Sequence, residues 1–235
     1  MPEHTVNRHL RGWSAVVVIL LFSLLPGVVL AAGPIYLDGQ FSDWSGQPYI
    51  TDPAGDGASN SDLRAFYWAT NPGQEIVYFM FQRTASLNAT YFAVLIDTNN
   101  DGDFSDSDDR LVIVRYTPRW FTGYVQIWVF DGDSNNISTN QGNWGDSMWG
   151  FGRRAEIGVS FADLGIDAHQ TINMAAVAFP SFNSSYFDWA PDSGTITWAP
   201  IPTLGWVWLT GVIVVVVAIA WYTKGRFKWQ PTSPS

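Results

Sequence analysis

The chain of 235 residues contains no cysteine, so no disulfide can stabilise its fold. Residues 33–203 also contain no lysine, a single histidine, His169, and only two glutamates, Glu75 and Glu156. Few pairs of nucleophile and base can be built from such a set. We therefore expect a protein without enzymatic activity, in which packing or a bound metal supplies the rigidity that disulfides cannot.

Helical periodicity is nearly absent from residues 33–200. Apolar and aromatic runs of strand length alternate instead with clusters of Gly, Asn, Asp, Ser and Pro, such as residues 52–57 and 131–136. This alternation predicts an all-β fold, an antiparallel two-sheet β-sandwich, in one domain over residues 33–200. The expected strands are 65–69, 76–82, 91–96, 110–116, 123–130, 155–160 and 171–179, with a short helical turn at 161–165.

Positive charge is scarce in the same part of the chain. Residues 33–203 hold seven arginines and twenty acidic residues, a formal charge of −13, whereas the whole chain carries −9. A surface of this kind repels phosphate backbones, so we expect no nucleic-acid partner. It is suited to divalent cations.

Long apolar runs occur near the two ends of the chain. In residues 1–32, Arg8 and Arg11 precede an almost wholly apolar stretch, and Ala31 and Ala32 offer small residues for cleavage. This layout predicts a secretory signal peptide. An uncleaved membrane anchor is the alternative, because the apolar stretch is long enough for one.

The second apolar run covers residues 204–222, which as a helix would span about 28 Å, close to the thickness of a bilayer core. Aromatic side chains lie near both ends, and a basic tail, residues 223–235, follows. We expect a single-pass transmembrane helix after a short spacer at 201–203, with the domain outside the cell membrane and the tail in the cytoplasm. The residues that carry this prediction are Trp206, Trp208, Trp221, Tyr222, Lys224, Arg226 and Lys228.

The stretch DTNNDGDFSDSD, residues 97–108, is the densest run of oxygen-bearing side chains. Its spacing matches a calcium loop, with a glycine, Gly102, at the sixth position. The predicted Ca²⁺ ligands are Asp97, Asn99, Asp101, Asp103 and Asp108. Because strands are expected on both sides, the ion would stabilise a hairpin and would not open a pair of helices.

The twelfth position leaves an alternative open. Asp108 stands where a bidentate Glu is usual, and its shorter side chain reaches less far. Asp106 or Asp109 could complete the coordination shell in its place. The competing interpretation of the whole loop is a solvated acidic turn without metal.

Aromatic residues form 16% of the chain, and several fall on expected loops. Trp and Tyr rings stack on sugar rings, while amides and carboxylates hydrogen-bond to hydroxyls, so residues 140–149 favour a carbohydrate site. The competing interpretation is that such rings cap the ends of the sandwich core. We assign Trp44 and Trp68 to the core and expect Trp128 to pack within a strand. The predicted ligand-binding residues are Trp120, Asn143, Trp144, Asp146, Trp149 and Trp189.

Three stretches together resemble the family-nine-like carbohydrate-binding modules, of the DOMON-like β-sandwich type. Residues 35–44 (IYLDGQFSDW) resemble the opening DG-x-x-x-D-W of that family, and residues 91–103 its strand followed by D-T-x-x-x-G. Residues 155–165 (AEIGVSFADLG) resemble its E-x-x-I-P-x-S-D-L-G strand and turn, with Val159 and Ser160 near the place where the family often has Pro. The resemblance implies a two-sheet sandwich and, in many members, sugar binding. Haem-binding relatives use Met or His ligands, but no pattern links Met80, Met148, Met174 and His169.

The residues IPTL at 201–204, followed by the apolar run and the basic tail, are similar to an IPTL-type C-terminal sorting signal. That resemblance implies removal of the helix and release of the domain to the cell surface. The sequence as a whole predicts a membrane-anchored, calcium-stabilised, extracytoplasmic module that binds carbohydrate or a cell-envelope component. The alternative is a structural cell-surface protein without a small ligand, and a haem-binding domain is less favoured.

Overall fold

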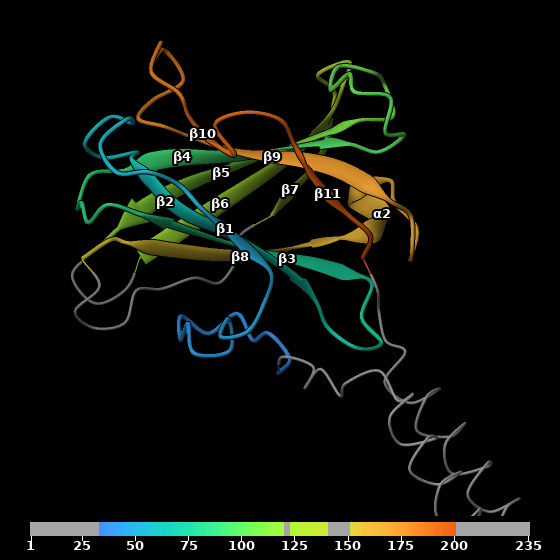
Figure 1. Ribbon diagram of the computed structural model, residues 1–235, viewed down its shortest axis with the longest axis horizontal. Helices are drawn as coiled ribbons and strands as arrows, with labels where there is room; N and C mark the ends of the chain where they lie inside the picture. The colour runs from blue at the N-terminus through green and yellow to red at the C-terminus, as the bar shows by residue number, and fades with distance from the viewer. Residues whose placement is uncertain (1–32, 120–122, 141–150, 201–235) are drawn as a thin grey trace, which may run out of the picture. The chain divides into compact units, whose positions relative to one another are not determined.

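In the computed structural model, the described residues are 33–119, 123–140 and 151–200. They form two antiparallel β-sheets and one short helix, which confirms the predicted all-β class (Figure 1). The predicted signal peptide, transmembrane helix and cytoplasmic tail lie outside these residues. Within them, no helix is long and apolar enough to cross a membrane.

The smaller sheet has four strands in the order β1-β2-β3-β8, and the larger has seven, with β10-β9-β4-β5-β6-β7 in order and β11 also paired to β9. The strands of the smaller sheet are β1 (Tyr49–Thr51), β2 (Leu63–Thr70), β3 (Ile76–Arg83) and β8 (Arg154–Ser160). Those of the larger are β4 (Thr90–Asp97), β5 (Arg110–Pro118), β6 (Gly123–Asp131), β7 (Asn136–Asn140), β9 (Ile172–Phe179), β10 (Asp188–Ala190) and β11 (Ile196–Trp198).

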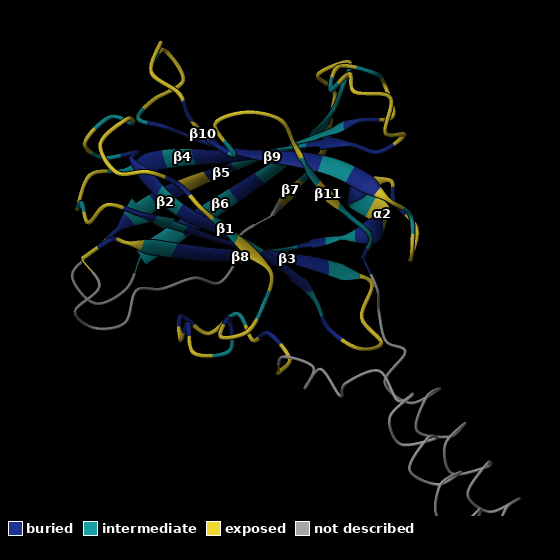
Figure 2. Ribbon diagram, in the orientation of Figure 1, coloured by how far each residue is buried: buried dark blue, intermediate teal, exposed yellow. Residues whose placement is uncertain are grey.

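Aromatic rings from both sheets form the centre of the core, where buried strand faces meet (Figure 2). Phe81 of β3 stacks on Phe92 of β4, with 4.6 Å between ring centroids and 8° between ring planes. Phe66 of β2 packs against Phe81 at 5.4 Å. Offset or edge contacts of this kind add about 0.5–1.5 kcal/mol each to the stabilisation from burial alone, so these rings fix how the sheets face each other.

The N-terminal segment, residues 33–48, covers the outer face of the smaller sheet (Figure 1). Its side chains Ile35, Phe41 and Trp44 pack with Tyr78 and Met80, which point outward from β3. The strand β3 is therefore buried on both faces. This explains why its sequence is a continuous apolar run without the alternation of a half-exposed strand.

All seven predicted strands are present, with ends shifted by up to two residues. The predicted helical turn is the helix α2 (Phe161–Leu164), which begins after Ser160, whose side chain accepts a hydrogen bond from the Asp163 N–H, and ends at Gly165 with a positive φ of 64°. Residues 131–136 form the predicted turn between β6 and β7. Trp44 and Trp68 are buried, as predicted, and Trp128 is half-buried in β6.

Candidate functional site

The acidic loop joins β4 to β5, as its flanking strands predict. Asp97, the last residue of β4, is buried, and its carboxylate accepts hydrogen bonds from the N–H groups of Asn100 at 2.6 Å and Gly102 at 3.0 Å. Gly102 has a φ of 90°, a conformation that favours glycine. The chain thus curls around the Asp97 carboxylate over the first six residues of the predicted metal loop.

The next predicted ligands each hold the backbone two residues further on. The Asn99 side-chain oxygen accepts from the N–H of Asp101, and the Asp101 carboxylate accepts from the N–H of Asp103. The Asp103 carboxylate accepts from both the N–H and the hydroxyl of Ser105, and these bonds lower its pKa. Successive Asx turns therefore fix the rotamers of three predicted ligands.

Of the three acids that could close the shell, Asp106 lies beside two predicted ligands, Asp101 and Asn99. Its carboxyl contacts that of Asp101, and this hydrogen bond and the negative charge of Asp101 raise the pKa of Asp106. Asp109 is buried, with its two carboxylate oxygens accepting from the N–H groups of Thr98 and Asp106, and burial raises its pKa. Asp108 is exposed, and its backbone oxygen accepts from Arg110 at 2.7 Å. Asp109 thus closes the base of the loop, whereas Asp106 faces the predicted calcium ligands Asp101 and Asn99.

Most of the predicted ligand-binding residues lie outside the described residues, namely Trp120, Asn143, Trp144, Asp146 and Trp149. Trp189 is in β10 and is 41% exposed. It pairs with Val177 of β9, which pairs with Ala93 of β4, and Ala93 in turn pairs with Ile113 of β5. Trp189 therefore belongs to an apolar row that crosses the outer face of the larger sheet.

A cleft of about 220 Å³ lies on the opposite side of the molecule, between the N-terminal segment and the smaller sheet. Aromatic rings, two amides and a guanidinium group line it. The residues that contribute these groups are Phe41, Trp44, Gln47, Tyr49, Tyr67, Gln82 and Arg154. We call this the tyrosine cleft.

The tyrosine cleft takes its shape from neighbouring strands. Tyr49 of β1 lies opposite Tyr67 of β2 in register, and the two rings stack with 4.9 Å between centroids. Trp44 meets Tyr67 edge-on at 6.2 Å, and the Arg154 guanidinium lies 5.4 Å from the centre of the Phe41 ring. Tyr49 is 55% exposed, and burial raises the pKa of Tyr67. The exposed ring of Tyr49 is thus open to solvent beside the phenol of Tyr67, which remains a hydrogen-bond donor at neutral pH.

Sequence reasoning did not identify the tyrosine cleft, although one signal was present. Tyr67 lies between the two core residues Phe66 and Trp68, so strand alternation places it on the opposite, outer face. The role of Tyr49 had no such signal, because β1 is only three residues long.

Comparison of the chain with protein-family models, with curated proteins and with solved structures finds no match.

Proposed function

We propose that this protein is an extracytoplasmic binding module, stabilised by calcium and anchored in the membrane by residues 204–222, whose ligand is a carbohydrate. The observation that carries the proposal is the tyrosine cleft. There the exposed ring of Tyr49 stands beside the amides of Gln47 and Gln82 and the guanidinium of Arg154.

The chemistry of the tyrosine cleft suits a sugar. The apolar C–H face of a pyranose can stack on an exposed tyrosine ring, and each glutamine amide both donates and accepts hydrogen bonds, as a hydroxyl requires. Arg154 adds donors only. The stacking of Tyr49 on Tyr67 holds the exposed ring in place, so little side-chain entropy remains to be lost when a ligand binds.

The calcium part of the proposal rests on the acidic loop between β4 and β5, residues 97–109, which we call the hairpin loop. Ca²⁺ takes about six to eight oxygen ligands, and Asn99, Asp101 and Asp106 place side-chain oxygens near one another. A cation there would relieve the repulsion between Asp101 and Asp106. Occupancy would stabilise the native state by mass action and would not switch its conformation.

Binding of the full-length chain to a panel of immobilised polysaccharides, by affinity electrophoresis and glycan array, tests the proposal. We expect retention on at least one glycan, with Tyr49→Ala weakening binding at least tenfold. Tyr36→Ala, which removes another exposed tyrosine that does not line the cleft, is the matched control and should leave binding unchanged. Trp144→Ala and Trp149→Ala test the predicted loop site in the same assay. Retention on no polysaccharide would overturn the proposal.

A structural surface protein without a small ligand is the second candidate. It is favoured by exposed rings beside the outer face of the larger sheet, where Phe182 is 59% and Phe187 is 51% exposed. Phe182 packs against Tyr91 of β4 at 4.4 Å, so the rings extend an apolar surface already present on the sheet. Concentration-dependent self-association in sedimentation experiments, lost in Phe182→Ser, would support this function, and a monomer at all concentrations would contradict it.

A further inference from the structure

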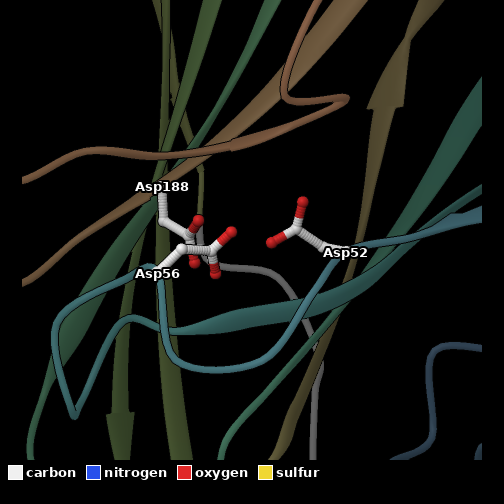
Figure 3. A group of neighbouring side chains, drawn as sticks. All are labelled: Asp52, Asp56 and Asp188. Atoms are coloured by element: carbon white, nitrogen blue, oxygen red, sulfur yellow. The ribbon is translucent and has the colours of Figure 1, made fainter.

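Three carboxylates from distant parts of the sequence meet at one edge of the sandwich (Figure 3). Asp52 directly follows β1 of the smaller sheet, Asp56 lies in the loop after it, and Asp188 begins β10 of the larger sheet. One oxygen of each carboxylate lies within 4.8 Å of an oxygen of the other two. The group therefore spans the junction between the two sheets.

Asp52 is the unusual member of the group. Its side chain is only 4% exposed, and among the described residues no N–H or hydroxyl group donates a hydrogen bond to either of its carboxylate oxygens. Figure 3 shows this carboxylate pointing toward those of Asp56 and Asp188. An ionised carboxylate that is removed from water without a partner costs several kcal/mol, so buried charges in proteins are normally paired or bound to metal.

Backbone N–H groups hold the Asp188 carboxylate and the loop that carries Asp56 in place. The Leu63 N–H donates to Oδ2 of Asp188 at 2.6 Å, and the Gly55 N–H donates to the buried Asp62 at 2.8 Å. Gly57 lies so close to the group that an added Cβ would stand 2.4 Å from Oδ2 of Asp188 and 2.8 Å from Cα of Asp62. The loop after β1 is thus packed directly against the carboxylates.

The charges in the group oppose one another. Burial, and then the charges of Asp188 and Asp56, raise the pKa of Asp52 to about 7. Burial likewise raises the pKa of Asp188 to about 6, with added repulsion from Asp56 and Asp62. A divalent cation among the three would turn this repulsion into attraction.

We propose that Asp52, Asp56 and Asp188 form a divalent-cation site that takes Ca²⁺, separate from the hairpin loop, and that the ion ties the edge of one sheet to the edge of the other. All three ligands are hard carboxylate oxygens, the kind that Ca²⁺ prefers. The exposed position of Asp56 leaves room for water to complete the shell. The site does not depend on carbohydrate binding.

Calcium titration of the metal-stripped, full-length chain in mild detergent, by calorimetry and by thermal unfolding, tests this site. Asp56→Asn is the main variant, because Asp56 is exposed and its loss leaves the core intact. Gly57→Ala is the second, because it moves the carboxylates without altering charge. Asp167→Asn, an exposed acid elsewhere, is the matched control.

All variants are also made in an Asp101→Asn background, so that the hairpin loop cannot mask the result. There we expect Asp56→Asn and Gly57→Ala to weaken calcium binding at least tenfold and to remove the calcium-dependent rise in Tm, and Asp167→Asn to change neither. Calcium affinity that stays within twofold on adding Asp56→Asn overturns the proposal, as does the absence of calcium binding by the wild type. If Asp101→Asn alone removes all calcium binding, the hairpin loop is the only site that binds calcium, and the proposed site at Asp52, Asp56 and Asp188 is overturned.

Discussion

The indole N–H of Trp44 donates a 2.9 Å hydrogen bond to Oε2 of Glu156, a residue 112 positions later in the chain. Oε1 of the same carboxylate accepts from the Gly39 N–H at 2.7 Å. Glu156 is fully buried in β8, so its carboxylate binds the N-terminal segment at two points to the outer face of the smaller sheet, in addition to the apolar packing there. Since that segment forms a wall of the tyrosine cleft, Glu156 indirectly shapes the cleft.

Replacing Trp44 with Phe should measure this contact. The change keeps an aromatic ring but removes the N–H donor, so Oε2 of the buried Glu156 no longer receives a hydrogen bond from this side chain. We expect a loss of about 1–3 kcal/mol in the free energy of unfolding. Trp68→Phe is the control, because the Trp68 Nε1 is buried without a hydrogen-bond partner among the described residues. Urea unfolding of both variants provides the comparison. Equal losses would show that the Trp44 bond contributes nothing.

The pH dependence of stability should also report on Glu156. Burial raises its pKa from 4.5 to about 7 in the folded chain, although the bonds from Trp44 and Gly39 act in the opposite direction. Between these pH values the native state binds more protons than the unfolded state. The contribution of Glu156 to the free energy of unfolding is therefore fully present below pH 4.5 and is lost as the pH rises through 7.

Glu156→Gln cannot titrate, so it isolates this contribution. Relative to the variant, the wild type should lose about 3 kcal/mol in the free energy of unfolding between pH 4 and pH 8. Both proteins are measured with excess chelator, and titration of the other buried acids cancels in the difference. If the free energy of unfolding of the wild type stays constant relative to that of Glu156→Gln, or rises relative to it as the pH increases, the raised pKa is contradicted.

The sequence predicted the strands that are long and flanked by turns, because their apolar runs are local signals. It did not predict β7, of five residues, or β1, β10 and β11, each of three residues, since pairing with another strand of the sheet defines them more than their own composition. The same limit applies to the sites. The spacing within residues 97–108 is visible in the sequence, whereas Asp52 and Asp188 are brought together only when the two sheets pack.

Arg83 illustrates another contact that no local pattern reveals. It is 1% exposed at the end of β3, and its guanidinium donates to the backbone oxygens of Gly152, Ser86 and Asn88 at 2.8–2.9 Å, as well as to that of Asn60. It also lies 4.9 Å from the centre of the Tyr116 ring. One cation thus holds three separate loops at this end of the sandwich.

We expect Arg83→Met to lower the free energy of unfolding by at least about 3 kcal/mol, because several buried carbonyls lose their donor at once. The control is Arg115→Met, which removes an exposed arginine from β5 and should change the free energy of unfolding by less than about 0.5 kcal/mol. Chemical denaturation of the two variants gives both values. A loss at Arg83 no larger than that at Arg115 would mean that the carbonyls find water instead.

The hairpin loop makes a prediction that separates its three candidate closing acids. Because the Asp106 carboxyl contacts that of Asp101, whereas Asp109 binds backbone N–H groups and Asp108 is exposed, Asp106 should be the acid that completes the calcium shell. In calcium titrations followed by Tm, Asp106→Asn should reduce the calcium-dependent stabilisation from the loop by at least half. Asp108→Asn should reduce it far less.

Asp109→Asn should behave differently from both. Its carboxylate ties Thr98 to Asp106 at the base of the loop, so its loss should lower Tm even when a chelator has removed all calcium. Measuring the three variants with calcium and with chelator therefore separates a ligand from a structural clamp. All titrations are made in an Asp56→Asn background, which keeps the inter-sheet carboxylates from contributing. If Asp108→Asn abolishes the calcium effect and Asp106→Asn does not, the twelfth position closes the shell, as it does in the EF-hand pattern.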